Sequence, residues 1–120
     1  MSVEAKLMEL GIQLPPPPPA VAAYEPWMRT GNLILTSGQL PWKNGELAFS
    51  GKCGAEITED QGYQAARQCA INAISQLKAA AGDLDRVRQI VKVDGYVHTS
   101  PGFRGHPQVL NGASELILSV

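Results

Sequence analysis

The chain has 120 residues, of which 44% are hydrophobic and 18% are charged, a balance typical of one globular domain with a sizeable core. Ten basic and eleven acidic residues leave a net charge of −1, which argues against the clustered basic surface that nucleic acid binding requires. No apolar run reaches membrane-spanning length and no secretory signal pattern opens the sequence, so we expect a cytoplasmic protein without membrane contact.

Residues 1–20 are expected to form an N-terminal helix followed by a polyproline spacer. In "SVEAKLMELG", Ser2 is a suitable N-cap, Gly11 marks the end, and Val3, Leu7 and Leu10 form one apolar face. The segment "LPPPPPA" that follows favours an extended polyproline helix. Two interpretations are open, a docking ligand for an aromatic-lined groove or a stiff spacer. The absence of a flanking basic residue favours the spacer.

Residues 21–52 have the pattern of short antiparallel strands. "AAYEPWMR" and "LILTSGQ" are joined by the turn signal "TGN", and "KNG" is a second turn signal followed by a short strand "ELAFSG". Pro26 indicates an edge or a bulge in the first strand, because proline cannot donate a ladder hydrogen bond.

The second of these strands ends in Ser37-Gly38-Gln39. A strand end that offers a hydroxyl and an unobstructed backbone N–H can hold a small anion or a carbonyl oxygen. The alternative is a polar turn before Pro41, and the pattern alone favours that turn.

A long helix is predicted to begin after Thr58, where "TEDQ" is a capping box completed by Gln61, and to end near Gly82. Apolar residues at helical spacing form one stripe of it: Tyr63, Ala66, Ala70, Ala73, Ile74, Leu77 and Ala81. Cys69 flanks this stripe and is interpreted as a small buried hydrophobe. With Cys53 it forms no CxxC pair and has no matching histidines, so we expect two free thiols and no metal.

Residues 86–100 alternate, which predicts a strand whose face of Val91, Val93 and Val97 packs on the helix. A last helix covers residues 109–120 and is apolar to its end, with no stop signal in "ELILSV". The elements together predict an α+β fold, with a mixed sheet and two helices on one face. Because a strand–helix unit normally returns to its sheet, we expect the chain to stop short of a final strand.

Most catalytic signatures are absent from the sequence, including GxSxG, HExxH and the phosphate-binding loop. His98 and His106 are the two histidines. A two-imidazole ribonuclease site would need both of them. The alternative, which their spacing favours, is one histidine on the sheet surface and one in a loop.

Four segments, "TGNLILTSGQLP", "AARQCAINAISQLKAAAG", "VKVDGYV" and "VLNGASEL", together resemble the Rid/YjgF family over residues 20–120. Its members are deaminases of reactive imines and enamines, and they are also labelled L-PSP endoribonucleases or translation inhibitors. The N-terminal helix and proline run resemble a divergent branch. The resemblance implies that residues 21–120 form a chorismate-mutase-like fold assembled as a homotrimer, with a substrate cleft between subunits and no cofactor.

The resemblance also implies which residues bind the substrate. By position, Tyr24 matches the cleft tyrosine of the family, Ser37 and Gly38 match its strand-end polar pair, and Asn111 matches its cleft asparagine. No residue is assigned a catalytic role. The family's substrate-binding arginine, usually followed by a cysteine and later by a glutamate, lies on a strand after the last helix. These 120 residues contain no counterpart of it.

The expected function is therefore hydrolysis of small 2-imino or 2-enamino acids to 2-keto acids and ammonia. A trimer that binds a small metabolite or a partner without turnover is the alternative, because a shared fold does not determine chemistry. RNA cleavage or translation inhibition ranks third, since it rests on the family label and the charge is near neutral.

Overall fold

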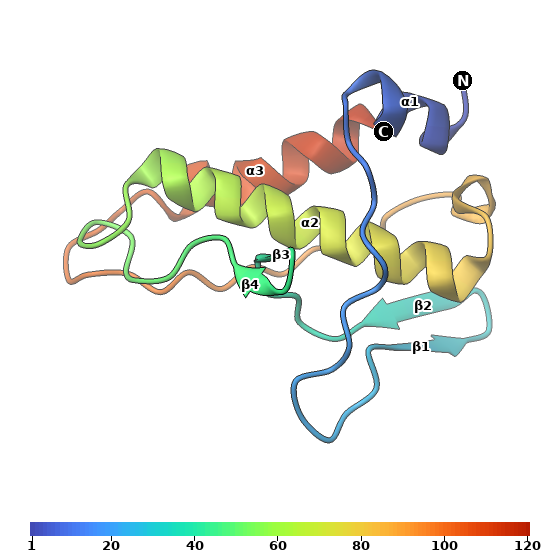
Figure 1. Ribbon diagram of the computed structural model, residues 1–120, viewed down its shortest axis with the longest axis horizontal. Coiled ribbons are helices and arrows are strands. Elements are labelled where there is room, and N and C mark those ends of the chain that lie inside the picture. The colour runs from blue at the N-terminus through green and yellow to red at the C-terminus, as the bar shows by residue number, and fades with distance from the viewer.

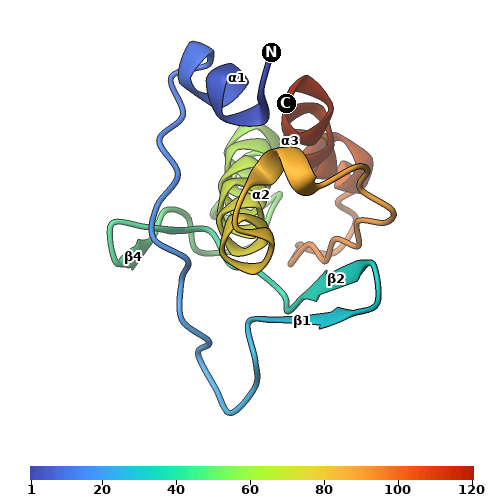
Figure 2. The ribbon, with the colours of Figure 1, turned by 90° about the vertical axis from the view of Figure 1, so that its right-hand side faces the viewer.

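The computed structural model describes residues 1–120, and it places three helices on one side of the molecule and two β-hairpins on the other (Figures 1 and 2). The elements in chain order are α1 (Val3–Glu9), β1 (Trp27–Thr30), β2 (Leu33–Thr36), β3 (Trp42–Lys43), β4 (Glu46–Leu47), α2 (Glu59–Ala81), the 3-10 turn η1 (Leu84–Arg86) and α3 (His106–Ser119). The α+β class is confirmed. The single mixed sheet is not formed, because β1 pairs only with β2 and β3 only with β4.

Helix α1 has the predicted N-cap, where Ser2 Oγ accepts a hydrogen bond from Ala5 N at 3.0 Å. Leu7 is buried in the core as predicted, but Leu10 is half-exposed and Ile12 is buried in its place. The helix ends at Glu9, so Leu10 does not continue the apolar helix face of Val3 and Leu7.

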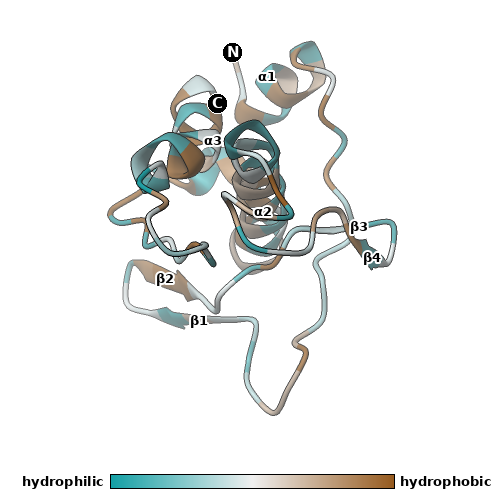
Figure 3. Ribbon diagram, turned by 90° about the vertical axis from the view of Figure 1, so that its left-hand side faces the viewer, coloured by the Kyte–Doolittle hydropathy of each residue, from teal (hydrophilic) through white to brown (hydrophobic).

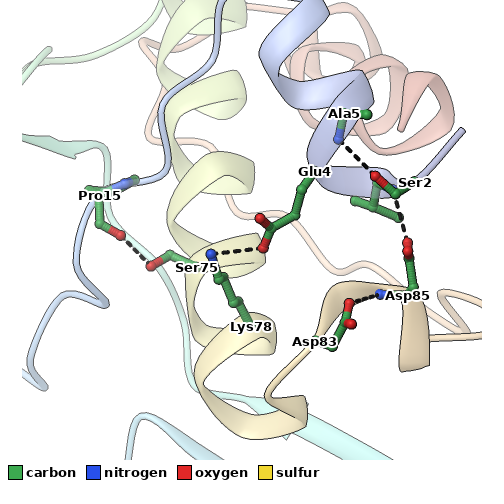
Figure 4. A network of polar contacts seen from close by, with 9 residues as sticks. Ser2, Glu4, Ala5, Pro15, Ser75, Lys78, Asp83 and Asp85 are labelled. Carbon is green, nitrogen blue, oxygen red and sulfur yellow. Dashed lines mark hydrogen bonds and ion pairs between the residues drawn. The ribbon is translucent and has the colours of Figure 1, made fainter.

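Polar contacts fasten this N-terminal segment to the rest of the chain (Figure 4). Lys78 on α2 pairs with Glu4 at 2.7 Å, and Val3 N donates to Asp85 Oδ1 at 2.9 Å. After α1 the proline run crosses α2, as the blue segment in Figure 1 shows, and Ser75 Oγ donates to the carbonyl of Pro15 at 2.6 Å.

Both predicted turns are present. Gly31 has a φ of +57°, and Asn44 and Gly45 have φ of 54° and 82°, the left-handed values that tight hairpin turns need. The strands are shorter than predicted. β1 begins only after Pro26, which supplies no N–H for a ladder, and β4 has two residues rather than six.

Helices α2 and α3 pack closely and carry the core. The capping box at the start of α2 is confirmed, and α3 has proline in its first turn. Tyr63 on α2 donates from its hydroxyl to Glu115 on α3 at 2.7 Å, and this bond raises the pKa of Tyr63. The main core cluster consists of Leu7, Ile12, Ala70, Ile71, Ile74, Leu84, Ala113 and Leu116.

The helix crossing depends on Gly112. A Cβ atom there would overlap the backbone carbonyl of Tyr63, so glycine lets the two helix backbones meet. Gly62 on α2 makes a second close approach, to Val109 of α3. One glycine on each helix therefore allows the close contact between α2 and α3.

The strand predicted over residues 86–100 does not form. No backbone group between residues 88 and 97 takes part in a backbone hydrogen bond. Val97 packs against a small cluster with Cys53 and Ile57, but Val91 and Val93 are exposed, so the valine face does not lie on a helix. Alternation predicts the shape of a strand, but a strand also needs a neighbour, and neither hairpin extends to this segment.

Apolar side chains also remain exposed on the hairpin side. β2 is coloured as strongly hydrophobic in Figure 3, and Met28, Leu33 and Leu35 are exposed. Val91, Val93 and Tyr96 are exposed as well, and exposed apolar side chains in such number commonly mark a contact with another chain. None of the helices combines the length and the apolar character that a bilayer crossing requires.

Candidate functional site

Three of the four predicted site residues lie together at the end of the β1–β2 hairpin. Ser37 follows β2 directly, and its backbone N–H donates to the carbonyl of Pro26 at 2.9 Å, which ties the strand end to the residue before β1. Its hydroxyl donates to the same carbonyl at 3.3 Å. Tyr24 lies just before this point, where its hydroxyl accepts a hydrogen bond from Val21 N at 3.3 Å.

Two adjoining hollows share these residues as a common wall. The outer hollow measures about 470 Å³ and is lined by Tyr24, Glu25, Trp27, Met28, Leu35, Thr36, Ser37 and Gly38. The inner cavity measures about 10 Å³ and lies between this strand end, the proline run and α2. Tyr24, Ser37 and Gly38 line both. A Cβ atom at Gly38 would meet nothing within 4 Å, so the backbone there is open to a ligand.

A polar face of α2 holds the inner wall in place. Asn72, which is 0% exposed, donates from Nδ2 to the carbonyls of Leu40 at 2.9 Å and Trp42 at 3.0 Å. Gln68 Nε2 donates to the same Trp42 carbonyl at 3.1 Å and to Asn72 Oδ1 at 3.2 Å. Leu40 lies before β3 and Trp42 begins it, so these side chains fix the position of the segment between Gly38 and β3 against α2.

The same face continues to the proline run. Gln76 Nε2 donates to the carbonyl of Pro18 at 2.7 Å, next to the bond from Ser75 to Pro15. Pro15 and Pro18 are three residues apart, which is one turn of a polyproline helix, so their carbonyls face the same side. The proline run is therefore packed on α2 through its backbone.

Sequence reasoning did not identify Gln76 as a residue of the inner wall. Gln68, Asn72 and Gln76 recur at intervals of four along α2, and this polar stripe beside the apolar one was a signal that could have revealed it.

Asn111 is not brought to this site within one chain. It is exposed on α3 and lines neither the outer hollow nor the inner cavity. No Lys or Arg side chain lines either one, and Glu25 is the single charged residue in the two walls.

The remaining reactive side chains lie elsewhere. No three His, Cys, Asp or Glu side chains gather as a possible metal site. The imidazole of His106 stacks edge-on against Phe103, with ring centroids 5.5 Å apart, and the backbone carbonyl of His98 accepts a hydrogen bond from Cys53 N.

Neither cysteine is activated as a nucleophile. Burial raises the pKa of the Cys69 thiol to about 11 and also raises that of Cys53. A raised pKa leaves the thiol protonated at all pH values below it, so the reactive thiolate is scarce at neutral pH.

We expect the folded protein to react slowly with a thiol reagent at pH 8. A pKa near 11 leaves roughly 0.1% of Cys69 as thiolate, at least 100-fold less than an ordinary cysteine. Labelling with Ellman's reagent, with and without urea, measures this difference. The unfolded chain should release two equivalents at once, and equally fast labelling of the folded chain would contradict the raised pKa of its thiols.

With this geometry established, the chain can be compared with known proteins. Residues 4–120 match the family described as "YjgF/chorismate_mutase-like, putative endoribonuclease". "Protein TCP17" of Trypanosoma cruzi is 43% identical over 118 residues, which are 98% of this chain and 74% of that protein.

Two solved structures are also similar. The crystal structure of a "putative endoribonuclease" from Shewanella oneidensis superposes with a TM-score of 0.97 at 39% identity, over 99% of this chain and 79% of the other. The crystal structure of Atu1372, a protein of unknown function from Agrobacterium tumefaciens, superposes with a TM-score of 0.89 at 39% identity, over 98% of this chain and 71% of the other.

The fold is that of a small α+β protein of the chorismate-mutase-like kind. The chain belongs to the YjgF/chorismate mutase-like family, as its resemblance to Rid/YjgF proteins predicted.

Proposed function

We propose that the protein hydrolyses small 2-imino or 2-enamino acids to 2-keto acids and ammonia. The observation that carries this proposal is the common wall of Tyr24, Ser37 and Gly38, which two adjoining hollows of unequal size share. A small amphipathic substrate fits such a wall, because the outer hollow is largely apolar while the strand end offers a hydroxyl and an open backbone N–H.

Hydrolysis of an imine needs little covalent chemistry from the protein. The imine carbon is already electrophilic, so water adds to it directly, and its oxygen forms the new bond to that carbon. The C–N bond of the resulting carbinolamine then breaks and ammonia leaves, which gives the 2-keto acid. Holding the substrate and water in register accounts for most of the rate gain. Ser37 and the Gly38 N–H hold polar atoms of the substrate, and Tyr24 covers it.

The site needs a second copy of the chain. We propose a homotrimer in which Asn111 of one subunit approaches the Tyr24–Ser37–Gly38 wall of its neighbour. Two observations support this assembly: Asn111 is exposed away from the hollows of its own chain, and Met28, Leu35 and Tyr96 are exposed apolar residues.

A further strand would pair with backbone that has no partner in these residues and would bring a positive charge to the site. We propose that an additional strand of the full-length protein pairs with the free backbone of residues 88–97 and carries the arginine that binds the substrate carboxylate. The relatives leave room for one, because this chain covers 74%, 79% and 71% of their lengths. An arginine–carboxylate pair contributes about 1.5–3 kcal/mol, or about 10- to 100-fold in binding.

One observation favours a second candidate, a trimer that binds a neutral or cationic metabolite without turnover. No basic side chain lines either hollow, and Glu25 gives the outer one an acidic rim. An apolar residue where the arginine is expected would favour this binding function. RNA cleavage, the activity named for the Shewanella relative, has less support, since a net charge of −1 provides no electrostatic attraction for RNA.

The test is release of ammonia and pyruvate from freshly generated 2-iminopropanoate by the full-length protein. We expect acceleration over buffer, and Ser37→Ala should lower kcat/KM by about 10-fold, the cost of one hydrogen bond to a charged substrate. Thr30→Ala, at the far end of the same hairpin, is the matched control and should leave the rate unchanged. A full-length trimer that releases ammonia no faster than buffer would exclude the deaminase.

A further inference from the structure

The proline run depends on α2 for its hydrogen bonds. Residues 13–20 take part in no backbone–backbone hydrogen bond, and two buried side chains of α2 hold the run instead. Ser75 Oγ donates to the carbonyl of Pro15 at 2.6 Å (Figure 4). The next residue of the helix, Gln76, donates from Nε2 to the carbonyl of Pro18 at 2.7 Å. These two carbonyls are therefore the points at which the run is fixed.

The two points differ in what lies beside them. The start of the run is also held by the core, because Leu14 packs against the main core cluster. After Pro18, no hydrogen bond links residues 19–25 to the rest of the chain, and the next one is at Pro26, whose carbonyl accepts from Ser37 N at 2.9 Å. The bond to Pro18 is thus the last one before the loop of residues 19–25.

Tyr24 lies in this loop and lines both hollows, but its own hydrogen bonds are local. Its N–H donates to the carbonyl of Ala22 at 2.9 Å, and its hydroxyl accepts from Val21 N at 3.3 Å. Such bonds shape the loop without fixing where it lies on the molecule. The ends of the loop set that position. At the first end the approach is stiff, because proline rings lock φ and a proline run keeps its direction over several residues.

The bond from Gln76 to Pro18 adds little to overall stability. The Gln76 side chain is buried and its Oε1 has no hydrogen-bond partner, and an unpaired buried polar atom costs at least as much as one neutral hydrogen bond contributes. We propose that Gln76 is a positioning residue, which sets where Tyr24 lies over the outer hollow through the Pro18 carbonyl and the stiff run. This role rests on the proposed function, in which Tyr24 covers the substrate.

One pair of variants of the full-length protein removes each bond in turn. Gln76→Met keeps a side chain of similar length and loses the donor to Pro18. Ser75→Ala is the matched control, because it loses the bond to Pro15, upstream of the point that is still held. We expect the loop of Tyr24 to be displaced in the first variant only.

A second pair changes the stiffness of the run at two exposed positions and leaves both bonds in place. Pro19→Gly introduces a flexible joint between Pro18 and Tyr24. Pro16→Gly introduces the same joint before Pro18. We expect Pro19→Gly to reproduce the effect of Gln76→Met, whereas Pro16→Gly should leave the loop in place.

The position of Tyr24 is read by 19F NMR of protein labelled with fluorotyrosine. The chain has three tyrosines, and Tyr24→Phe identifies the resonance of interest. Gln76→Met and Pro19→Gly should move this resonance toward its position in the unfolded chain. The resonance of Tyr63 should not move, because that side chain bonds to α3 and reports the packing of the two helices. An equal shift at Tyr63 would assign the effect to helix packing and overturn the inference.

Turnover of 2-iminopropanoate gives the second readout. If Tyr24 occupies its covering position only a tenth of the time, KM rises about 10-fold while kcat is unchanged. We expect this rise in Gln76→Met and the parental KM in Ser75→Ala. Equal KM values in an active protein, or a Tyr24 resonance that stays in place in Gln76→Met, would overturn the inference. A displaced resonance in a protein that releases no ammonia in any form would retain the positioning of Tyr24 by Gln76 and reject the deaminase.

Discussion

Replacing Asn72 with leucine should lower the free energy of unfolding by about 2–4 kcal/mol, although the two side chains have the same number and branching of heavy atoms. Asn72 is fully buried, and its amide donates to the carbonyls of Leu40 and Trp42. Leucine would leave the Leu40 carbonyl without that donor and would deprive Gln68 of an acceptor. Unpaired buried polar groups cost about 1–3 kcal/mol each.

Urea unfolding monitored by circular dichroism measures this loss. Gln64→Leu is the matched control, because it also replaces an amide side chain with leucine, but at an exposed position of the same helix, and should change stability by less than about 0.5 kcal/mol. Hydrogen exchange should also become faster in residues 38–43 of Asn72→Leu. Equal stability of the two variants would contradict the role of α2 in holding the strand end.

Gly112→Ala should destabilise the protein by about 2 kcal/mol, even though alanine is the better helix former by about 1 kcal/mol. The new methyl group would overlap the backbone carbonyl of Tyr63, which cannot move without separating α2 from α3. Overpacking of this kind costs about 1–3 kcal/mol, and a clash with backbone belongs at or above the upper end.

Thermal unfolding gives the readout, with an expected fall in Tm of roughly 6–10 °C for a domain of this size. Gln108→Ala, exposed on the same helix, is the control and should leave Tm nearly unchanged. A rise in Tm for Gly112→Ala would mean that helix propensity decides at this position and that the two backbones are not in contact.

The sequence predicted those features that depend on neighbouring residues. The capping box of Thr58 with Gln61 and the turn at Asn44–Gly45 involve interactions across one to three residues, and both are present. The strand over residues 86–100 failed for the opposite reason. Its alternation is local, but pairing requires a partner strand from elsewhere. Residues 88–97 have none, and the segment pairs only at Thr99, in an isolated bridge with Cys53.

The same distinction between local and long-range interactions applies to the candidate site. Ser37 and Gly38 drew attention because a strand ends there in polar residues, and Tyr24 followed from the family resemblance. Gln76 was not predicted, because its contacts to Pro18 and to the inner cavity join segments 58 residues apart. A polar residue inside an apolar helix indicates a buried partner, but its identity becomes visible only in the folded chain.

The central claim is that the site is shared between subunits, with Ser37 from one and Asn111 from the next. The most direct test mixes full-length Ser37→Ala and Asn111→Ala chains, unfolds them together and refolds them. Each variant alone should be impaired at all clefts of its trimer. In an equal random mixture about one quarter of the clefts combine an intact Ser37 with an intact Asn111, so about a quarter of the parental ammonia release should return. A mixture no more active than the mean of the two separate variants would contradict the shared site.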